Sequence, residues 1–331
     1  MQKKPRILAV VGSTASGKTS LSIALAKRLG GEIVSCDSMQ IYRRMDVGTA
    51  KPTLEEQDGV PHHLIDFMEP DTPFSSAEYV EAASACIREI TARGRLPILC
   101  GGTGLYLDCL LRGGNFEETV TDPALRAELF SYAAANGNAA LHRMLREIDP
   151  ESAETIHENN VKRVVRAIEI YRTSGMTKSE ADRRSIPADP PYDATVLGLR
   201  YGARELLYQR IDLRVGQMLE AGLLEETARL YAEGIFERNS TAAQAIGYKE
   251  LLGHLRGECS LAEATETLQR ATRRYAKRQI TWFSAKPYVR WIDADEEGRM
   301  RPFEEILADA LAIFDRVSKT AESSRKQRKG G

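Results

Sequence analysis

Short apolar runs alternate with amphipathic patterns over roughly the first hundred residues of the chain. The apolar runs are too short for buried helices and have the length of buried strands. Between them, apolar residues recur every three or four positions, as they do on one face of a helix. This alternation predicts a parallel sheet with helices on both faces. The expected strands cover residues 5–12, 32–36, 63–65 and 97–100, and the expected helices cover 19–29 and 78–92.

The pattern changes after about residue 115. From there to residue 184 the apolar spacing is helical, and residues 185–192 contain three prolines, which is typical of a linker. Strand character resumes at 194–199. We therefore expect an α/β domain that is interrupted by a mostly helical insertion. The predicted division is 1–115 for the first part of the core, 116–192 for the insertion and 193–317 for the second part of the core.

The last third of the chain is mostly helical in pattern. Its final residues, 318–331, are rich in basic residues and end in two glycines, so we expect a disordered tail there. The expected helices before the tail cover 203–220, 223–233, 242–256, 261–284 and 303–317, with a strand at 289–292.

Composition narrows the class of protein. The 331 residues are 42% hydrophobic and 28% charged, as in ordinary globular proteins. No apolar run approaches the roughly 20 residues that cross a bilayer, and the N-terminus has no signal-peptide core. We therefore expect a cytoplasmic protein with no membrane partner, and a monomer. The five cysteines form no C-x-x-C pair, which favours buried thiols over zinc or disulfides.

A phosphate-binding loop follows the first apolar run. The stretch GSTASGKT matches the pattern G-x-x-x-x-G-K-[ST] in full, with a strand before it and a helix after it. Backbone N–H groups and the helix N-terminus would hold a phosphate, Lys18 would bind its oxygens, and Thr19 would bind Mg²⁺. The residues of this loop are Gly12, Ser13, Thr14, Ala15, Ser16, Gly17, Lys18 and Thr19.

The acid that usually accompanies such a loop is not in its usual place. In P-loop NTPases a later strand ends in an aspartate that helps to hold Mg²⁺. Here the strand at 97–100 ends in Gly-Gly-Thr-Gly, whereas Asp37 follows the strand at 32–36. Because the carboxyl ends of parallel strands share one edge, Asp37 and Thr103 should face the loop. Asp37 could serve a magnesium ion, accept a proton from a nucleophile or simply shape a turn.

Two groups of basic residues stand out in a chain whose net charge is only −1. Residues 268–290 contain seven basic residues and no acid, with aromatic residues among them. Basic side chains bind phosphates and aromatic rings stack on bases, although a solvated helix face would look the same. A second group, Lys162, Arg163 and Arg166, lies in the expected insertion. Together the two groups favour a nucleic-acid partner.

Other candidates carry weaker signals. His62 and His63 are adjacent, so on a strand they point to opposite faces and make a poor metal site. Gly247 falls inside a helical pattern, in the stretch 240–250, where it costs stability, so we expect a close approach at that point.

Several motifs together resemble one family. The chain is similar to the tRNA dimethylallyltransferases, also called tRNA isopentenyltransferases. The matching stretches occur in the family's order over about residues 6–290, and they are VVGSTASGKTSLSIALA, IVSCDSMQIYRRMDVGTAKP, VPHHLID, ILCGGTGLYL, NNVKRVVRAIEIY, QAIGYKE and RRYAKRQITWF. The absence of C-x-x-C fits the shorter bacterial type rather than eukaryotic relatives that carry a zinc finger.

The resemblance implies a fold and a reaction. The fold would be a P-loop nucleotide-kinase-like core with a helical insertion. The reaction would transfer a dimethylallyl group from dimethylallyl diphosphate to N6 of the adenosine 3′-adjacent to the anticodon in tRNA, with Mg²⁺ and release of diphosphate. Alternatives are an ATP-dependent small-molecule kinase, a prenyltransferase acting on free AMP, and a non-catalytic RNA-binding protein.

The resemblance also implies roles for residues. Asp37 would be the general base, with Lys18 and Thr103 close to the reacting bond. The residues expected to bind the diphosphate are the loop 12–19 with Arg274 and Arg278. Those expected to contact the anticodon stem-loop of tRNA are Asp37, Ser38, Met39, Gln40, Lys162, Arg163, Arg166, Lys277, Arg278 and Gln279.

Overall fold

The computed structural model of the chain describes residues 4–113, 121–184, 189–238 and 241–329. The chain divides into two compact units. The core unit contains Met1–Leu111 and Pro191–Gly331, and the insertion unit contains Arg112–Pro190. The boundary expected between residues 115 and 116 lies outside the described residues.

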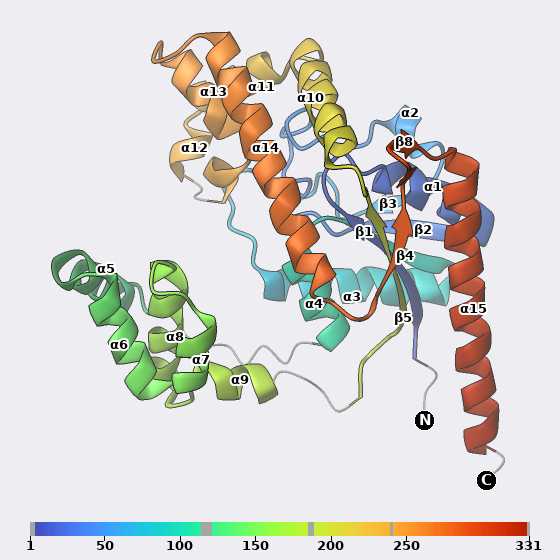
Figure 1. Ribbon diagram of the computed structural model, residues 1–331, viewed down its shortest axis with the longest axis horizontal. Coiled ribbons are helices and arrows are strands. Elements are labelled where there is room, and N and C mark those ends of the chain that lie inside the picture. Colours follow the sequence, from blue (N-terminus) through green and yellow to red (C-terminus); the bar gives the residue numbers. More distant parts are fainter. Residues whose placement is uncertain (1–3, 114–120, 185–188, 239–240, 330–331) are drawn as a thin grey trace. The chain divides into compact units, whose positions relative to one another are not determined.

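A parallel sheet forms the centre of the core unit, which confirms the expected α/β class (Figure 1). Its strand order is β3-β2-β4-β1-β5-β6, so the chain crosses from β1 past β4 before it reaches β2. Every pairing in this sheet is parallel. The strands are β1 (Arg6–Gly12), β2 (Gly31–Ser35), β3 (His62–His63), β4 (Leu96–Gly101), β5 (Asp193–Arg200) and β6 (Val289–Asp293).

Alternate residues of the strands bury against helices on opposite faces of the sheet. Leu8 and Val10 of β1 pack on the face that carries α1 (Lys18–Leu29) and α15 (Phe303–Lys329). Ile7, Ala9 and Val11 pack on the other face, against α3 (Ser76–Ala92) and α4 (Gly104–Arg112). Since both faces are covered, the strands read as continuous apolar runs.

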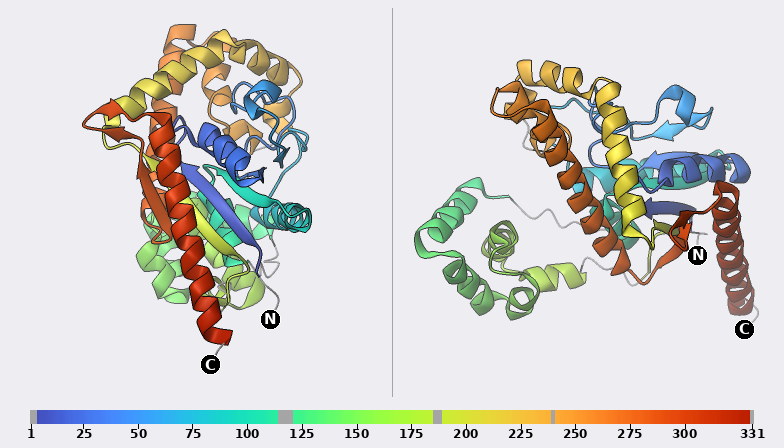
Figure 2. Two further views of the ribbon diagram at one scale, coloured as in Figure 1. Left: turned by 90° about the vertical axis from the view of Figure 1, so that its right-hand side faces the viewer. Right: turned by 45° about the horizontal axis from the view of Figure 1, so that its top comes forward.

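A group of helices follows β5 and packs around a separate apolar cluster. Figure 2 shows α10 and α14 side by side, and the two helices are in contact. The cluster also takes in Ile41, Tyr42 and Met45, which follow β2. The helices are α10 (Arg204–Glu220), α11 (Leu223–Ala232), α12 (Ile235–Arg238), the short 3₁₀ turn Ala242–Gln244, α13 (Tyr248–Leu255) and α14 (Leu261–Ser284).

The insertion unit is helical in its described residues, and its core lies between α5, α6 and α8. Buried apolar residues on the three helices, such as Leu129, Leu141 and Ile168, form that core. Its helices are α5 (Pro123–Asn136), α6 (Asn138–Ile148), α7 (Pro150–Thr155), α8 (Val161–Ser174) and α9 (Lys178–Arg184).

The structure differs from the expected elements in three places. The expected helix 242–256 is interrupted between the 3₁₀ turn Ala242–Gln244 and α13. Gly247, the residue before α13, has φ 110°, which no residue inside a helix adopts. The expected tail is helical through Lys329, because no glycine or proline interrupts α15 and its Lys, Glu, Arg and Gln residues favour helix. Short elements without strong signals also form, namely α2 (Leu54–Gln57), β7 (Asp295–Glu296) and β8 (Arg299–Met300). None of the described helices is both long and apolar enough to span a membrane.

Candidate active site

A cavity of about 370 Å³ lies where β1, β2 and β4 end. Parallel sheets commonly bind ligands at this edge, beside the point where the strand order reverses. The phosphate loop contributes Thr14, Lys18 and Thr19 to its wall, and residues 37–40 after β2 form another part. Helices α10 and α14 and the residues before α13 complete the wall. We call this space the loop cavity.

Lys18 is a half-buried cation of the loop cavity. Its Nζ donates a hydrogen bond to the Ser13 carbonyl at 3.2 Å. Burial lowers the pKa of Lys18, the positive charge of Arg214 lowers it further, and the carboxylate of Asp37 opposes both effects. Two cations and one carboxylate therefore act on each other within the same cavity.

Arg214 is a cavity residue that the sequence analysis did not single out. It lies on α10, and burial lowers its pKa, while the negative charge of Asp37 favours its charged form. No described side chain forms an ion pair or hydrogen bond with its guanidinium. Nothing in the local sequence distinguishes Arg214 from other arginines on helices, and only the packing of α10 brings it to the loop.

Gln279 braces the phosphate loop from α14. Its Oε1 accepts a hydrogen bond from the Thr14 N–H at 2.8 Å, and its Nε2 donates to the Gly102 carbonyl at 3.0 Å. Arg210 of α10 also donates to the loop, at 2.9 Å from the Ala15 carbonyl. The shape of the loop therefore depends on helices far along the chain, and both ends of the buried Gln279 amide are used within the protein.

Asp37 combines a turn with a free carboxylate oxygen. Its Oδ1 accepts hydrogen bonds from the N–H groups of Met39 at 2.9 Å and Gln40 at 3.4 Å. Its Oδ2 has no hydrogen-bond partner among the described residues. Asp37 therefore shapes a turn through Oδ1, as one of the alternatives expected. Its Oδ2 stays available to a ligand in the loop cavity.

Thr103 lies behind this segment and is not among the residues that line the loop cavity. Its Oγ1 accepts a hydrogen bond from the Ser38 N–H at 3.0 Å, and its own N–H donates to the Cys36 carbonyl at 3.1 Å. Thr103 therefore contacts Ser38, the residue after Asp37, and its expected role close to the reacting bond stays a prediction.

Met39 and Gln40 have different surroundings. Met39 lines the loop cavity and packs on the apolar cluster of the helices that follow β5. The amide of Gln40 accepts a hydrogen bond from Ser35 and donates to the carbonyls of Thr49 and Ala50, at 3.3 and 3.1 Å. Gln40 therefore fixes the neighbouring loop, and both ends of its side-chain amide are occupied.

A buried carboxylate holds residues 46–48, of which Gly48 lines the loop cavity. Glu226 of α11 accepts hydrogen bonds from the N–H groups of Asp46, Val47 and Gly48 at 2.9 to 3.0 Å. It also accepts from the Tyr248 hydroxyl at 2.7 Å. The close approach expected at Gly247 is not found, because a Cβ there would lie 3.6 Å from the Gly48 carbonyl oxygen, an ordinary contact, and the positive φ of 110° accounts for the glycine. The tight contact is at Gly48, where a Cβ would lie 2.4 Å from the Tyr248 ring.

Replacing Glu226 with alanine should destabilise the core unit strongly. Four donors would lose their acceptor in a buried site, and each unsatisfied group costs about 1–3 kcal/mol. We expect a loss of about 3 kcal/mol or more in the free energy of unfolding, measured by urea denaturation. Glu225→Ala is the matched control, because Glu225 is the neighbour of Glu226 in sequence and its side chain is exposed. Equal stability of the two variants would show that Glu226 is not a structural anchor.

The basic residues of α14 fall into separate groups. Arg278 lines the loop cavity, whereas Arg274 lines a neighbouring cavity, and Lys277 is exposed and lines neither. Arg273 pairs with Asp212 of α10, at 3.0 Å between Nε and Oδ1. The helix therefore presents arginines to the two cavities on one side and ties itself to α10 on another.

The basic residues of the insertion unit also differ among themselves. Lys162 and Arg163 are exposed on α8 and have no acidic partner among the described residues. Arg166 instead pairs with Glu169, a buried carboxylate that also binds Arg126 at 2.9 Å. Lys162 and Arg163 therefore remain available to an anionic partner, as does the exposed Arg172 in the last turn of the same helix.

The oxygen donors of the loop cavity suit magnesium. Mg²⁺ takes few protein ligands and shares its remaining positions between water and substrate phosphates. The Thr19 hydroxyl and the Asp37 carboxylate both line the cavity, and both are hard oxygen donors. Over the described residues, no group of three or more His, Cys, Asp or Glu side chains has the arrangement of a metal site. His63 instead contacts Glu32 at 2.7 Å.

Comparison with known proteins identifies the family. A family model described as IPP transferase matches residues 40–286. The tRNA dimethylallyltransferase of Bacillus licheniformis is 50% identical over 293 residues, which are 88% of this chain and 91% of the relative. A protein of the same name from Caldanaerobacter subterraneus is 43% identical over 308 residues, covering 93% of this chain and 98% of the relative.

Solved structures agree with the sequence relatives. The tRNA isopentenylpyrophosphate transferase from Bacillus halodurans superposes with a TM-score of 0.71 at 43% identity, covering 97% of this chain and all of the other. A eukaryotic dimethylallyltransferase described as acting on tRNA gives a TM-score of 0.72 at 30% identity, covering 88% of this chain and 74% of the other. The chain carrying this phosphate loop and carboxylate therefore belongs to the IPP transferase family of enzymes.

Proposed function

We propose that the chain transfers a dimethylallyl group from dimethylallyl diphosphate to N6 of the adenosine 3′-adjacent to the anticodon in tRNA. The observation that supports this most is that one cavity contains both the phosphate loop and the carboxylate of Asp37. The names of the sequence relatives agree with the same reaction. We expect the protein to act as a monomer in the cytoplasm.

The phosphate loop and nearby cations would bind the prenyl donor. The backbone N–H groups of the loop, with Lys18, Arg214 and Arg278, would hold the diphosphate and meet the charge that grows on it. Thr19 would help to hold Mg²⁺, which when bound neutralises charge on the leaving diphosphate.

Asp37 would act on the acceptor, the adenine amine. The adenine amine is a poor nucleophile, because its lone pair is delocalised into the ring, so its placement beside the allylic carbon supplies much of the rate. The C–O bond to the diphosphate breaks and a C–N bond forms, while N6 gives one proton to the free oxygen of Asp37. The base must leave the stack of the anticodon loop to reach this cavity.

The alternatives have less support. A small-molecule kinase also uses a phosphate loop, but the chain's relatives at 43–50% identity bear the name of a tRNA prenyltransferase. A prenyltransferase acting on free AMP would not need the exposed cations Lys162 and Arg163. A non-catalytic RNA-binding protein would not need a carboxylate beside the loop.

The direct test is the mass of an RNA product. An anticodon stem-loop would be incubated with the chain, dimethylallyl diphosphate and Mg²⁺, and we expect its mass to rise by one C₅H₈ unit. Chelation of Mg²⁺ should suppress the change. An unchanged RNA mass with the complete mixture, or prenylation of AMP in preference to the stem-loop, would contradict the proposal.

Arg163→Ala should weaken RNA binding with little effect on the chemical step. The guanidinium is exposed and unpaired with acid, so its loss removes about one phosphate contact. We expect the slope of log affinity against log salt concentration to fall by about 1, measured by fluorescence anisotropy with a labelled stem-loop. Arg143→Ala, an exposed arginine of α6, is the control. An equal fall of the salt slope in both variants would mean that Arg163 of α8 makes no specific contact with the RNA.

A further inference from the structure

A hairpin near the end of the chain reaches back to the start of α10. The short strands β7 and β8 form this hairpin. The Ala294 N–H donates a hydrogen bond to the Arg200 carbonyl at 2.8 Å, so the chain enters the hairpin beside the end of β5. Asp295, the first residue of β7, therefore lies next to residues 202 and 203, which lead into α10.

Asp295 caps α10 from another element of the fold. Its side chain is buried, its Oδ1 accepts a hydrogen bond from the Gly202 N–H at 2.6 Å, and its Oδ2 accepts one from the Ala203 N–H at 2.9 Å. Ala203 is the N-cap residue of α10, and alanine has no side-chain oxygen to accept a bond there. The carboxylate supplies that acceptor, and its negative charge complements the positive end of the helix dipole.

The contacts of Asp295 leave it no direct role in ligand binding. It forms no ion pair with a described cation, since the neighbouring Arg200 pairs with Asp293 and Arg301 pairs with Asp309. It does not line the loop cavity. Because a buried carboxylate is costly unless its oxygens are satisfied, its two bonds to the backbone at the start of α10 are its main compensation. Asp295 can therefore influence the loop cavity only through the elements that it holds.

Two carbonyls of the phosphate loop are held by α10 and by the residue that follows β5. Arg210 of α10 donates from Nε to the Ala15 carbonyl at 2.9 Å, and the Tyr201 hydroxyl donates to the Ser16 carbonyl at 3.4 Å. Ala15 has a φ of 60°, a left-handed conformation that alanine rarely adopts, so its surroundings must hold it in place. Because the C=O and N–H of a trans peptide point in opposite directions, these contacts also fix the direction of the N–H groups that follow each carbonyl.

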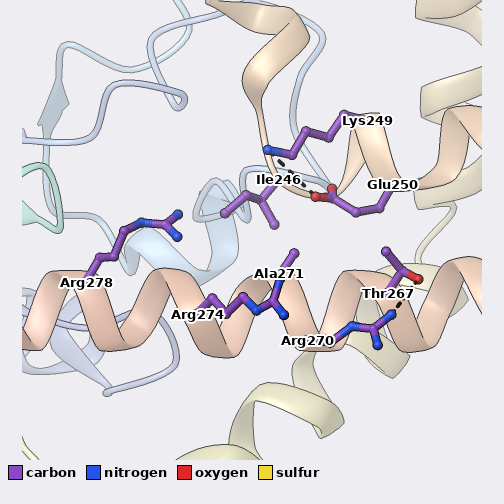
Figure 3. Close-up of a pocket in the computed structure, with 8 residues that line it drawn as sticks. All are labelled: Ile246, Lys249, Glu250, Thr267, Arg270, Ala271, Arg274 and Arg278. Atoms are coloured by element: carbon purple, nitrogen blue, oxygen red, sulfur yellow. Dashed lines mark hydrogen bonds and ion pairs between the residues drawn. The ribbon is translucent and has the colours of Figure 1, made fainter. Parts of the chain in front are cut away.

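Helix α14 holds a different part of the loop. Its Gln279 accepts the bond from the Thr14 N–H, whereas its arginines line the neighbouring cavity of about 390 Å³, across from Ile246 (Figure 3). Ala15 instead lies in one buried apolar cluster with two residues of α10. The shape of the loop at residues 15 and 16 therefore depends on where α10 begins.

We propose that Asp295 is a positioning residue of the donor site, which fixes the start of α10 and thereby sets the shape of the phosphate loop through Tyr201 and Arg210. This rests on the proposed function, in which the loop holds the diphosphate of the prenyl donor. Arg214 lies one turn beyond Arg210 on α10, so the same anchor sets the place of its guanidinium in the loop cavity. Asp295 lies outside every motif that the sequence analysis singled out.

The first test is the binding of inorganic diphosphate with Mg²⁺, measured by isothermal titration calorimetry. We expect Kd to rise about tenfold in Asp295→Ala, the usual size of a lost helix cap. Asp295→Asn keeps one carbonyl oxygen as acceptor, so its Kd should rise only about threefold. Glu296→Ala, which changes the exposed next residue, is the matched control and should bind as the wild type does. In steady-state kinetics, KM for dimethylallyl diphosphate should follow the Kd values, and KM for the stem-loop should not change.

A double-mutant cycle shows whether Asp295 acts through Arg210. Arg210→Met removes the bond to the Ala15 carbonyl, and in that background Asp295→Ala should raise Kd by less than about twofold further. Urea unfolding of every variant sets the temperature at which all are folded. If Asp295→Ala does not fold, Asp295→Asn takes its place in the cycle.

An unchanged Kd in the folded Asp295 variants would overturn the inference, as would effects that multiply in the double variant. Equal rises in KM for the donor and for the RNA would also overturn it, because a general loss of structure would affect both substrates. Failure of the proposed function would look different, since the wild type would then leave the RNA mass unchanged while the binding of diphosphate would still report on Asp295.

Discussion

Asp37→Asn should lower the rate of prenyl transfer by about 10²–10⁴-fold at saturating RNA, the usual contribution of a general base. The asparagine oxygen can still accept the hydrogen bonds from the Met39 and Gln40 N–H groups, so the turn survives. The amide cannot take a proton from adenine N6. A single-turnover assay measures this rate, and the affinity for the stem-loop should change by no more than about threefold, since the hydrogen bonds of the turn are kept.

Asp37→Ala serves as the companion variant, because it removes the turn hydrogen bonds as well. If Asp37 acts through its carboxylate, the asparagine and alanine variants should lose similar amounts of rate. A wild-type rate in Asp37→Asn, with a slow Asp37→Ala, would show that the residue only shapes the turn.

Arg214→Gln should lower kcat/KM for dimethylallyl diphosphate by about 10²–10³-fold, the usual effect of removing one donor to a developing negative charge. Arg214 shares the loop cavity with Lys18 and has no acidic partner among the described side chains, so its charge is free for the leaving diphosphate. Steady-state kinetics with the stem-loop held at saturation measures the effect. The loss of Arg214 should also raise the pKa of Lys18, because one of the two causes that lower it disappears.

Arg204→Gln is the matched control for Arg214, since it lies exposed at the start of the same helix. It should keep the kinetic constants of the wild type. An Arg214→Gln variant with an intact kcat/KM for the diphosphate, or one that loses only RNA affinity, would exclude Arg214 from the donor site.

The spacing of apolar residues was sufficient to predict most strands and helices of the fold. The buried strands of the sheet and the helix 261–284 form where periodicity predicts them, because each buries apolar residues. The edge strand β3 covers His62–His63 instead of the expected 63–65. The pattern failed at Gly247, where helical spacing continues across a residue whose positive φ cannot belong to a helix. It failed again after residue 317, where composition suggested disorder but nothing in the chain ends the helix.

The site was predictable only in part. The phosphate loop and Asp37 have local signatures, and the loop's Lys18 and Thr19 line the same cavity as that carboxylate. Arg214 and Glu226 have none, because their environments come from helices that pack onto the loops from far along the chain. Gln40 and Gln279 match motifs, yet their amides bind protein groups, a distinction that depends on contacts between distant segments.

The central claim is that the phosphate loop holds a diphosphate that is discarded, while the carbon chain attached to it moves. Dimethylallyl diphosphate labelled with ¹⁴C in the prenyl group and ³²P in the diphosphate tests this claim in one reaction with an anticodon stem-loop. We predict that the carbon label enters the RNA and that an equal amount of the phosphorus label appears as free inorganic diphosphate. Phosphorus label in the RNA, or release of diphosphate without carbon transfer, would contradict it.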